Sequence, residues 1–186
     1  MSTYQTQGMI LKITDRGESD QLFSIYTATA GKILALGKGT KKIKSKLNGQ
    51  LRLFAIIDLM IAPGKNHDHV AAAAFAANFF GITNDLKKII YASFALELVE
   101  RLTKPGDGDE KIFALLAGYL QAINDHQYSS RQWPTIKQAF MVKFLTLLGL
   151  APPAGIAQDV KKLEDFLNQH LEKPLETEKF LAKMSP

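Results

Sequence analysis

The hydrophobic pattern of this 186-residue chain changes type once, close to residue 80. Before that point, short apolar runs with β-branched residues alternate with Gly, Pro, Asp and Asn turn signals, which is typical of antiparallel strands. From Asn84 onward, apolar residues recur at the three- and four-residue spacing of amphipathic helices. The pattern therefore predicts an α+β chain in which strands come first and helices follow.

Closely spaced turn signals in the first part indicate a small antiparallel barrel or sandwich. We expect strands at residues 8–14, 21–27, 32–36 and 51–61, the last being the longest. Residues 67–80 are rich in alanine, which favours a helix, but they follow a hairpin-like turn. We predict that they form a fifth strand, which closes the barrel.

The second part predicts a helix that Asn84 or Asp85 caps, followed by helices at about residues 109–124 and 134–148. Residues 157–184 predict two further amphipathic helices, separated at Pro174. Glu97 and Glu100 fall on the outer face of the first helix. We therefore predict a small barrel domain over residues 1–80 and a helical domain over residues 81–186.

The formal net charge of +5 is unevenly placed. Residues 1–54 hold nine Lys or Arg and three Asp or Glu, which gives +6, whereas residues 55–186 hold fourteen and fifteen, which gives −1. Such asymmetry indicates one surface with an anionic partner.

The excess charge comes from a stretch between Gln21 and Ile57 that has seven basic residues and no acidic residue. A lysine-rich loop on a small barrel suits a phosphate backbone, although a charged run is also compatible with a solvated loop without a ligand. We predict that the loop lysines contact nucleic-acid phosphates and that three further basic residues add to the field. The loop residues are Lys38, Lys41, Lys42, Lys44 and Lys46, and the others are Lys12, Lys32 and Arg52.

Aromatic residues that stack on bases are few in this region. They are Tyr4, Phe23, Tyr26 and Phe54, and the apolar neighbours of Phe23 and Phe54 indicate core positions. On the predicted helix at residues 134–148, Lys137, Phe140 and Lys143 combine charge with an aromatic ring. This set suits an acidic, hydrophobic peptide of a partner, but it also fits an ordinary helix with phenylalanine inside and lysine outside.

Other chemistry is poorly supported. The chain has no cysteine, which excludes disulfides and cysteine-based metal sites. His67 and His69 would share a strand face but have no evident third ligand, so we expect no metal and no cofactor. Neither a nucleophile–base pair nor P-loop spacing is present, so we expect no enzyme. No leader or membrane span is evident, and we expect a cytoplasmic protein.

Several short motifs, in their order along the chain, are similar to those of a known family. They are Thr6-Gln-Gly8, Gly17-Glu-Ser-Asp20, Tyr26-Thr27, Gly31-Lys32, Lys38-Gly39 leading to Ser45-Lys-Leu47, Tyr91-Ala-Ser-Phe94 and Gly149-Leu-Ala-Pro152. The chain thereby resembles the RecO family of bacterial recombination mediators over most of its first 150 residues.

The resemblance implies an N-terminal OB-fold followed by a helical domain. It also implies binding to single- and double-stranded DNA, annealing of complementary strands, and work with RecR and single-stranded-DNA-binding protein to load the recombinase RecA. Members of the family commonly carry a four-cysteine zinc module after the Gly-Leu-x-Pro segment, and this chain has no cysteine there. The resemblance therefore implies no zinc here, and two alternatives stay open: a protein-binding adaptor and an RNA-binding OB module.

Overall fold

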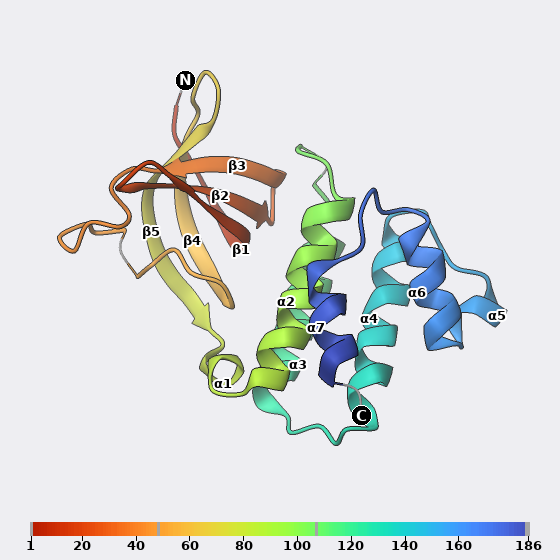
Figure 1. Ribbon diagram of the computed structural model, residues 1–186. Helices are drawn as coiled ribbons and strands as arrows, with labels where there is room; N and C mark the ends of the chain where they lie inside the picture. Colours follow the sequence, from red (N-terminus) through yellow and green to blue (C-terminus); the bar gives the residue numbers. More distant parts are fainter. Residues whose placement is uncertain (1, 48, 107, 185–186) are drawn as a thin grey trace. The chain divides into compact units, whose positions relative to one another are not determined.

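Five strands form a closed barrel in the first part of the chain (Figure 1). The structure is a computed structural model that describes residues 2–47, 49–106 and 108–184. Around the barrel the strand order is β1-β2-β3-β5-β4, the arrangement of an OB-type barrel, as the sequence predicts. The strands are β1 (Tyr4–Arg16), β2 (Asp20–Thr27), β3 (Gly31–Gly37), β4 (Ala55–Ala62) and β5 (Asp68–Asn78).

Strand β1 pairs with two neighbours and so joins the two sides of the barrel. It is antiparallel to β2 from Gly8 to Arg16 and antiparallel to β4 from Tyr4 to Gly8. Gly8 takes part in both pairings, and a Cβ atom there would lie 2.7 Å from Ile25 Cγ2 and 2.8 Å from Leu59 Cδ1. A larger residue would therefore push the barrel wall apart at this point. The ring is closed where β3 pairs in parallel with β5 at Ala35 and Asp68.

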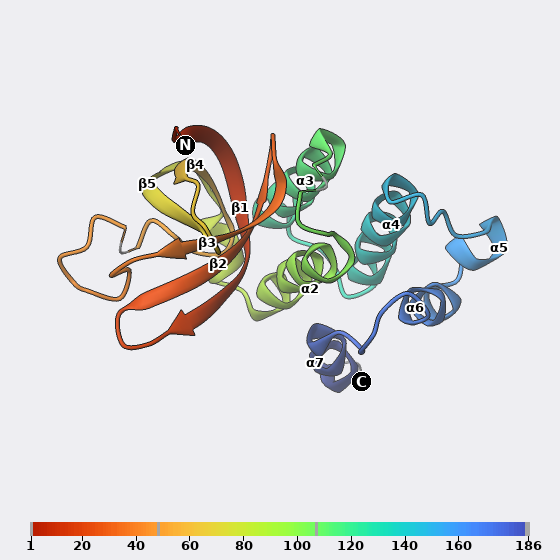
Figure 2. The ribbon, with the colours of Figure 1, turned by 90° about the horizontal axis from the view of Figure 1, so that it is seen from above.

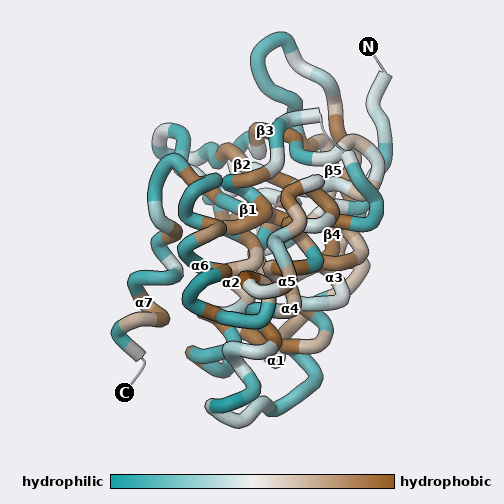
Figure 3. The backbone as a smooth tube through the Cα atoms, turned by 90° about the vertical axis from the view of Figure 1, so that its right-hand side faces the viewer, coloured by the Kyte–Doolittle hydropathy of each residue, from teal (hydrophilic) through white to brown (hydrophobic). Residues whose placement is uncertain are grey.

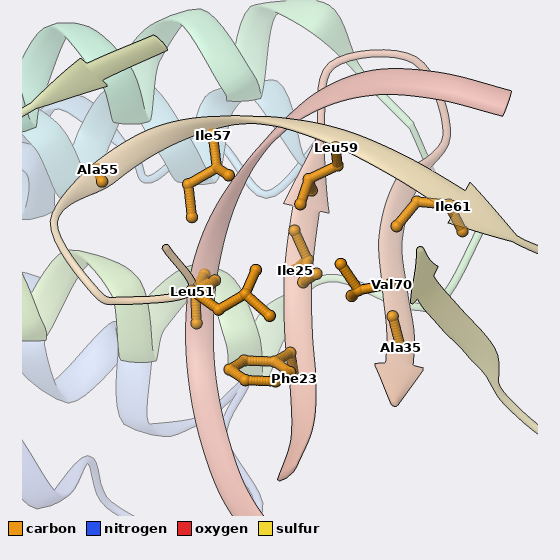
Figure 4. Packing of buried hydrophobic residues seen from close by; sticks show 10 residues of the cluster. Phe23, Ile25, Ala35, Leu51, Ala55, Ile57, Leu59, Ile61 and Val70 are labelled. Carbon is orange, nitrogen blue, oxygen red and sulfur yellow. The ribbon is translucent and has the colours of Figure 1, made fainter. Parts of the chain in front are cut away.

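The barrel interior is filled by aliphatic side chains around the ring of Phe23 (Figure 4). Inward-facing residues alternate along β4, where Ile57, Leu59 and Ile61 are buried and Asp58 is exposed. This alternation is the period of two that a half-buried strand requires.

The predicted strand at residues 51–61 begins too early. Strand β4 starts at Ala55, and the longest strand is β1, with 13 residues. Phe54 has a φ of 59°, in the left-handed region that strands do not use. Leu51 is only 7% exposed and reaches from the segment before β4 toward Phe23 (Figure 4). The first residues of the apolar run are therefore apolar because they fill the barrel core. Only the residues from Ala55 onward form a strand.

The barrel unit also includes residues beyond β5. By their contacts, Met1–Phe80 and Thr103–Phe113 group into one compact unit, and Gly81–Leu102 and Ala114–Pro186 group into a second. The buried Tyr26 hydroxyl donates to the carbonyl of Asp109 at 3.4 Å and accepts from its amide at 3.2 Å. The amide of Gly106 donates to the carbonyl of Lys32 at 3.1 Å. These bonds join residues 103–113 to strands β2 and β3.

The second part of the chain is helical, as the periodicity predicts. Asp85 caps the first long helix, because its Oδ1 accepts from the amides of Lys87 at 2.8 Å and Lys88 at 3.2 Å. The predicted split at Pro174 is confirmed, whereas the one-turn helices α1 and α5 were not predicted. The helices are α1 (Phe80–Thr83), α2 (Leu86–Leu102), α3 (Glu110–Asp125), α4 (Gln132–Leu147), α5 (Ala154–Ala157), α6 (Val160–Asn168) and α7 (Glu176–Met184).

The last two helices are amphipathic and pack on earlier ones. Along α6 and α7 the backbone alternates between hydrophilic and hydrophobic residues (Figure 3). Leu163 and Leu167 of α6 and Leu175, just before α7, are buried. Helix α7 lies against α2 (Figure 2), and α6 lies against α4. The apolar core of the helical unit therefore includes residues of α6 and the residue before α7.

The packing of Leu51 leads to a test of the barrel core. We expect Leu51→Ala to lower the free energy of unfolding by about 2–5 kcal/mol, because it removes a buried side chain and leaves a cavity. Leu34→Ala, at a position 39% exposed on β3, is the matched control and should cost much less. Denaturant unfolding followed by circular dichroism measures both. Equal costs for the two variants would show that Leu51 is not part of the core.

Candidate nucleic-acid interface

The connection between β3 and β4 carries the predicted lysine run and projects from the barrel in both ribbon views (Figures 1 and 2). Because β3 pairs with β5, the chain leaving β3 must cross the end of the barrel to reach β4. We call residues 38–47 the lysine loop. All five of its lysines are exposed: Lys38, Lys41, Lys42, Lys44 and Lys46. The loop therefore presents a concentrated positive charge to solvent.

The base of the lysine loop is fixed to the turn between β1 and β2. Asp20 Oδ1 accepts a hydrogen bond from the amide of Gly39 at 2.7 Å, and the carbonyl of Ser19 accepts one from the backbone amide of Lys41 at 3.1 Å. Thr40 is buried at this point. A Cβ atom on Gly37 would lie 2.7 Å from the ring of Phe23, so glycine is needed where the loop leaves the core. These contacts anchor the loop to the barrel.

Beyond its base, the lysine loop is a series of short turns. The carbonyl of Gly39 accepts from the amide of Lys42 at 3.0 Å, and the carbonyl of Lys42 accepts from Ser45 at 2.9 Å. Ile43 lies between two lysines and is 94% exposed. Turns of this kind keep the backbone partly satisfied, and all five lysines of the loop are exposed.

One loop lysine already has an acidic partner. Lys41 Nζ lies 2.6 Å from Asp15 Oδ2. The hydrogen bond from Lys41, followed by one from Gln21, lowers the pKa of the Asp15 carboxyl below its ordinary value. Asp15 is thus ionised at neutral pH, and a phosphate that approached Lys41 would compete with this carboxylate.

The other three predicted basic residues differ in their surroundings. Lys12 is exposed on β1, and Lys32 is buried, at 9% exposure, on β3. Arg52 is half-buried, and its guanidinium carbon lies 4.3 Å from the centre of the Phe75 ring and 4.8 Å from that of Phe80. Lys12 and Arg52 thus have accessible surface, whereas Lys32 is largely covered by protein.

The aromatic residues considered from the sequence are mostly inside. Phe23, Tyr26 and Phe54 are buried, and Tyr4 is half-buried with its hydroxyl 3.5 Å from Asp68 Oδ2. Burial and this contact, in that order, raise the pKa of Tyr4. Sequence reasoning missed Phe75 and Phe80, whose rings lie beside Arg52. The only signal for them was the presence of three phenylalanines in the ambiguous alanine-rich segment at residues 67–80.

The candidate residues on α4 lie in three different environments. Lys137 is buried, and its Nζ lies 2.8 Å from Glu164 Oε1 and 2.6 Å from Glu178 Oε1. Phe140 is buried against Tyr119, with ring centres 4.4 Å apart, whereas Lys143 is exposed. The ammonium of Lys137 therefore interacts with acids of α6 and α7 of this chain.

A pocket of about 490 Å³ adjoins Lys137 within the helical unit. Its lining includes the rings of Tyr91 and Trp133, which stack with their centres 4.6 Å apart, and Leu181 of α7. Lys87 lies at the same pocket and is exposed. The pocket combines an aromatic wall with positive and negative side chains, since Glu164 and Glu178 line it as well. Such a lining is suitable for a small amphipathic group.

Metal ligands do not gather in the part of the chain that the structure describes. No group of three or more His, Asp or Glu side chains there is placed to hold a metal ion. His69 is in β5, and His67 comes just before it. Within the same described ranges, no helix combines the length and the apolar character needed to cross a bilayer.

Two family models match the chain. Residues 1–79 match the model described as recombination protein O N terminal, and residues 83–154 match recombination protein O C terminal. The chain belongs to the RecO family. The first match covers the barrel with its lysine loop, and the second covers the helical unit as far as the start of α5.

Curated RecO proteins agree with this assignment. The DNA repair protein RecO of Alkaliphilus metalliredigens is 30% identical and covers 80% of this chain and 59% of the relative. The RecO protein of Trichodesmium erythraeum is 31% identical, and the match covers 80% of this chain and 54% of the relative. The RecO protein of Gloeothece citriformis is 32% identical, and the match covers 81% of this chain and 53% of the relative. The chain therefore spans a little more than half the length of these relatives.

Residues after the RecO matches form helices that pack on the helical unit. Glu97 of α2 accepts hydrogen bonds at the start of α7, from the amides of Glu176 at 2.8 Å and Thr177 at 3.0 Å and from the Thr177 hydroxyl at 2.8 Å. The expectation that Glu97 lies on an outer helix face was therefore wrong. Its carboxylate satisfies the free amides that begin every helix.

Burial of Glu178 predicts a pH effect on this packing. Burial raises the pKa of the Glu178 carboxyl, and Lys137 opposes the rise only in part. The folded state thus binds this proton more readily than the unfolded state, so the contribution of Glu178 to stability grows as the pH falls through its folded pKa toward 4.5. We expect the wild type to gain stability relative to Glu178→Gln between pH 8 and pH 5.

Urea unfolding followed by the fluorescence of Trp133, the only tryptophan, measures this difference. Glu172→Gln, at an exposed position between α6 and α7, is the matched control and should show no such trend. A constant difference between wild type and Glu178→Gln across the pH range would contradict the burial of this carboxyl.

Proposed function

We propose that this chain is a non-catalytic recombination mediator that acts in DNA repair in the cytoplasm. In this proposal it binds single- and double-stranded DNA, anneals complementary strands, and works with RecR and single-stranded-DNA-binding protein to load the recombinase RecA. Membership of the RecO family and the names of the curated relatives support the repair role. The observation that carries DNA binding is the anchored loop with five exposed lysines in nine residues.

Annealing is a suitable activity for such a surface because it requires no proton transfer and no bond cleavage. Two complementary strands repel each other through their phosphates. A cluster of ammonium groups that replaces the condensed counterions lets them approach. Phosphate contacts of this kind position the strand without reading its sequence, which suits a protein that must act on any sequence.

The proposal predicts a specific salt dependence. We expect single-stranded DNA to bind with an affinity that falls steeply with salt. Replacing Lys42, Lys44 and Lys46 with alanine should lower the affinity and reduce the slope of log K against log salt by about 2, at roughly 0.7 for each lost phosphate contact. Lys41 is left in place because of its ion pair with Asp15. Fluorescence anisotropy across a salt series gives both quantities.

The matched control is a triple alanine variant at exposed lysines of the helical unit, Lys161, Lys173 and Lys183. It removes the same charge and should leave the slope unchanged. Equal losses in the two variants would mean that only net charge matters, which contradicts the loop as the binding site. Stronger binding of single-stranded RNA than of DNA in competition would favour an RNA-binding module. Absence of DNA binding alongside a stable protein complex would favour an adaptor.

The ion pair of Lys41 predicts a gain of function. Asp15→Asn removes one negative charge and releases Lys41, so we expect affinity for single-stranded DNA to rise about two- to fivefold at low salt, the size of one exposed ion pair. Asp58→Asn is the control, because Asp58 is equally an exposed acid of the barrel but is hydrogen-bonded to Gln7. The idea is refuted if both variants gain affinity to the same extent in an anisotropy titration.

A further inference from the structure

Three segments of the barrel unit bring Arg52 and two phenylalanines together. Arg52 comes from the segment before β4, Phe75 from β5, and Phe80 from the first residue of α1. The guanidinium carbon lies over both rings, 4.3 Å from the centre of Phe75 and 4.8 Å from that of Phe80. Arg52 also donates a hydrogen bond to Asn78 Oδ1. The guanidinium is therefore held in place by an amide oxygen and two aromatic faces.

The ring of Phe80 is presented to solvent although a neighbouring ring is buried. Phe80 is 58% exposed, whereas Phe79 beside it is 2% exposed. Phe75 is half-buried and supports Arg52 from the strand. The planar guanidinium of Arg52 lies against the Phe80 ring, so the ring is held in place while much of it stays exposed.

Arg52 of this cluster comes soon after the lysine loop along the chain. It is six positions after Lys46, so even a fully extended backbone places their Cα atoms at most about 22 Å apart. No acidic residue occurs between Gln21 and Ile57, and Arg52 itself adds positive charge beside the rings. A ligand at the cluster should thus have an aromatic group that contacts the rings and negative charges close to that group.

We infer that Phe80, with Arg52 and Phe75 behind it, is a stacking platform for an unpaired nucleobase of a strand whose phosphates contact the lysine loop. This inference rests on the proposed function and adds to it a preference for single strands, because bases in a duplex have no free face to offer. Every base has a π-face, so such a platform is tolerant of sequence. Together with the phosphate contacts of the lysine loop, the platform would hold a single strand whose bases are unstacked.

The test separates base contacts from phosphate contacts. Anisotropy is measured with two labelled single strands of equal length, one with normal bases and one made entirely of abasic sites. We expect Phe80→Ala to weaken binding of the base-bearing strand about tenfold or more and to leave the abasic strand unaffected. Phe80→Trp should retain binding of the base-bearing strand, and Arg52→Lys, which keeps charge but loses the planar group, should weaken that strand more than the abasic one.

The matched control is Phe180→Ala on α7, where the side chain is 59% exposed, and it should change neither affinity. Trp133 fluorescence and circular dichroism confirm that each variant is folded. The platform is overturned if Phe80→Ala binds the base-bearing strand as the wild type does, or if it weakens both strands equally. In either case, the proposed function would still stand if wild-type binding is salt-sensitive and the triple lysine variant loses it. Failure of the wild type to bind either strand would overturn both.

Discussion

Closure of the barrel is the constraint on which the rest of this structure depends. Strand β3 closes the ring by pairing with β5 rather than with β4, the next strand in the chain. The connection from β3 to β4 must therefore cross one end of the barrel, and it supplies both a core residue, Leu51, and the exposed lysines. Closure also removes the unpaired strand edges that would otherwise invite aggregation. One topological requirement thus produces the segment to which we assign DNA binding.

Anchoring distinguishes the lysine loop from an ordinary charged surface segment. Its first residues are tied to the β1–β2 turn through Asp20 and Ser19, and Gly37 leaves the barrel in close contact with Phe23. The loop is thus held at one end while its lysines stay exposed. Arg52 lies where the chain returns to the barrel, with Phe75 and Phe80 against it. Phosphate contacts would then come from the lysine loop, and base contacts from the place where the connection returns to the barrel beside β5 and α1.

Much of this fold follows from the pattern of residues, and the failures have physical reasons. The period of two with frequent turns predicted the barrel, the period near 3.6 predicted the long helices, and charge counting located the lysine loop. The start of β4 was misplaced because Leu51 is apolar for burial and not for strand pairing. The contact of Arg52 with two rings depends on the pairing of β4 with β5, and the role of Glu97 depends on α7, about 80 residues later. Neither leaves a local signal in the sequence.

The most direct test of the account is protection of individual lysines by DNA. Brief acetylation of the protein with and without single-stranded DNA, followed by mass spectrometry, gives the modification rate of each lysine. We expect DNA to protect Lys38, Lys42, Lys44 and Lys46, while Lys161 and Lys173 of the helical unit react at unchanged rates. Unprotected loop lysines alongside protected lysines in the helical unit would contradict the assignment of DNA binding to this loop.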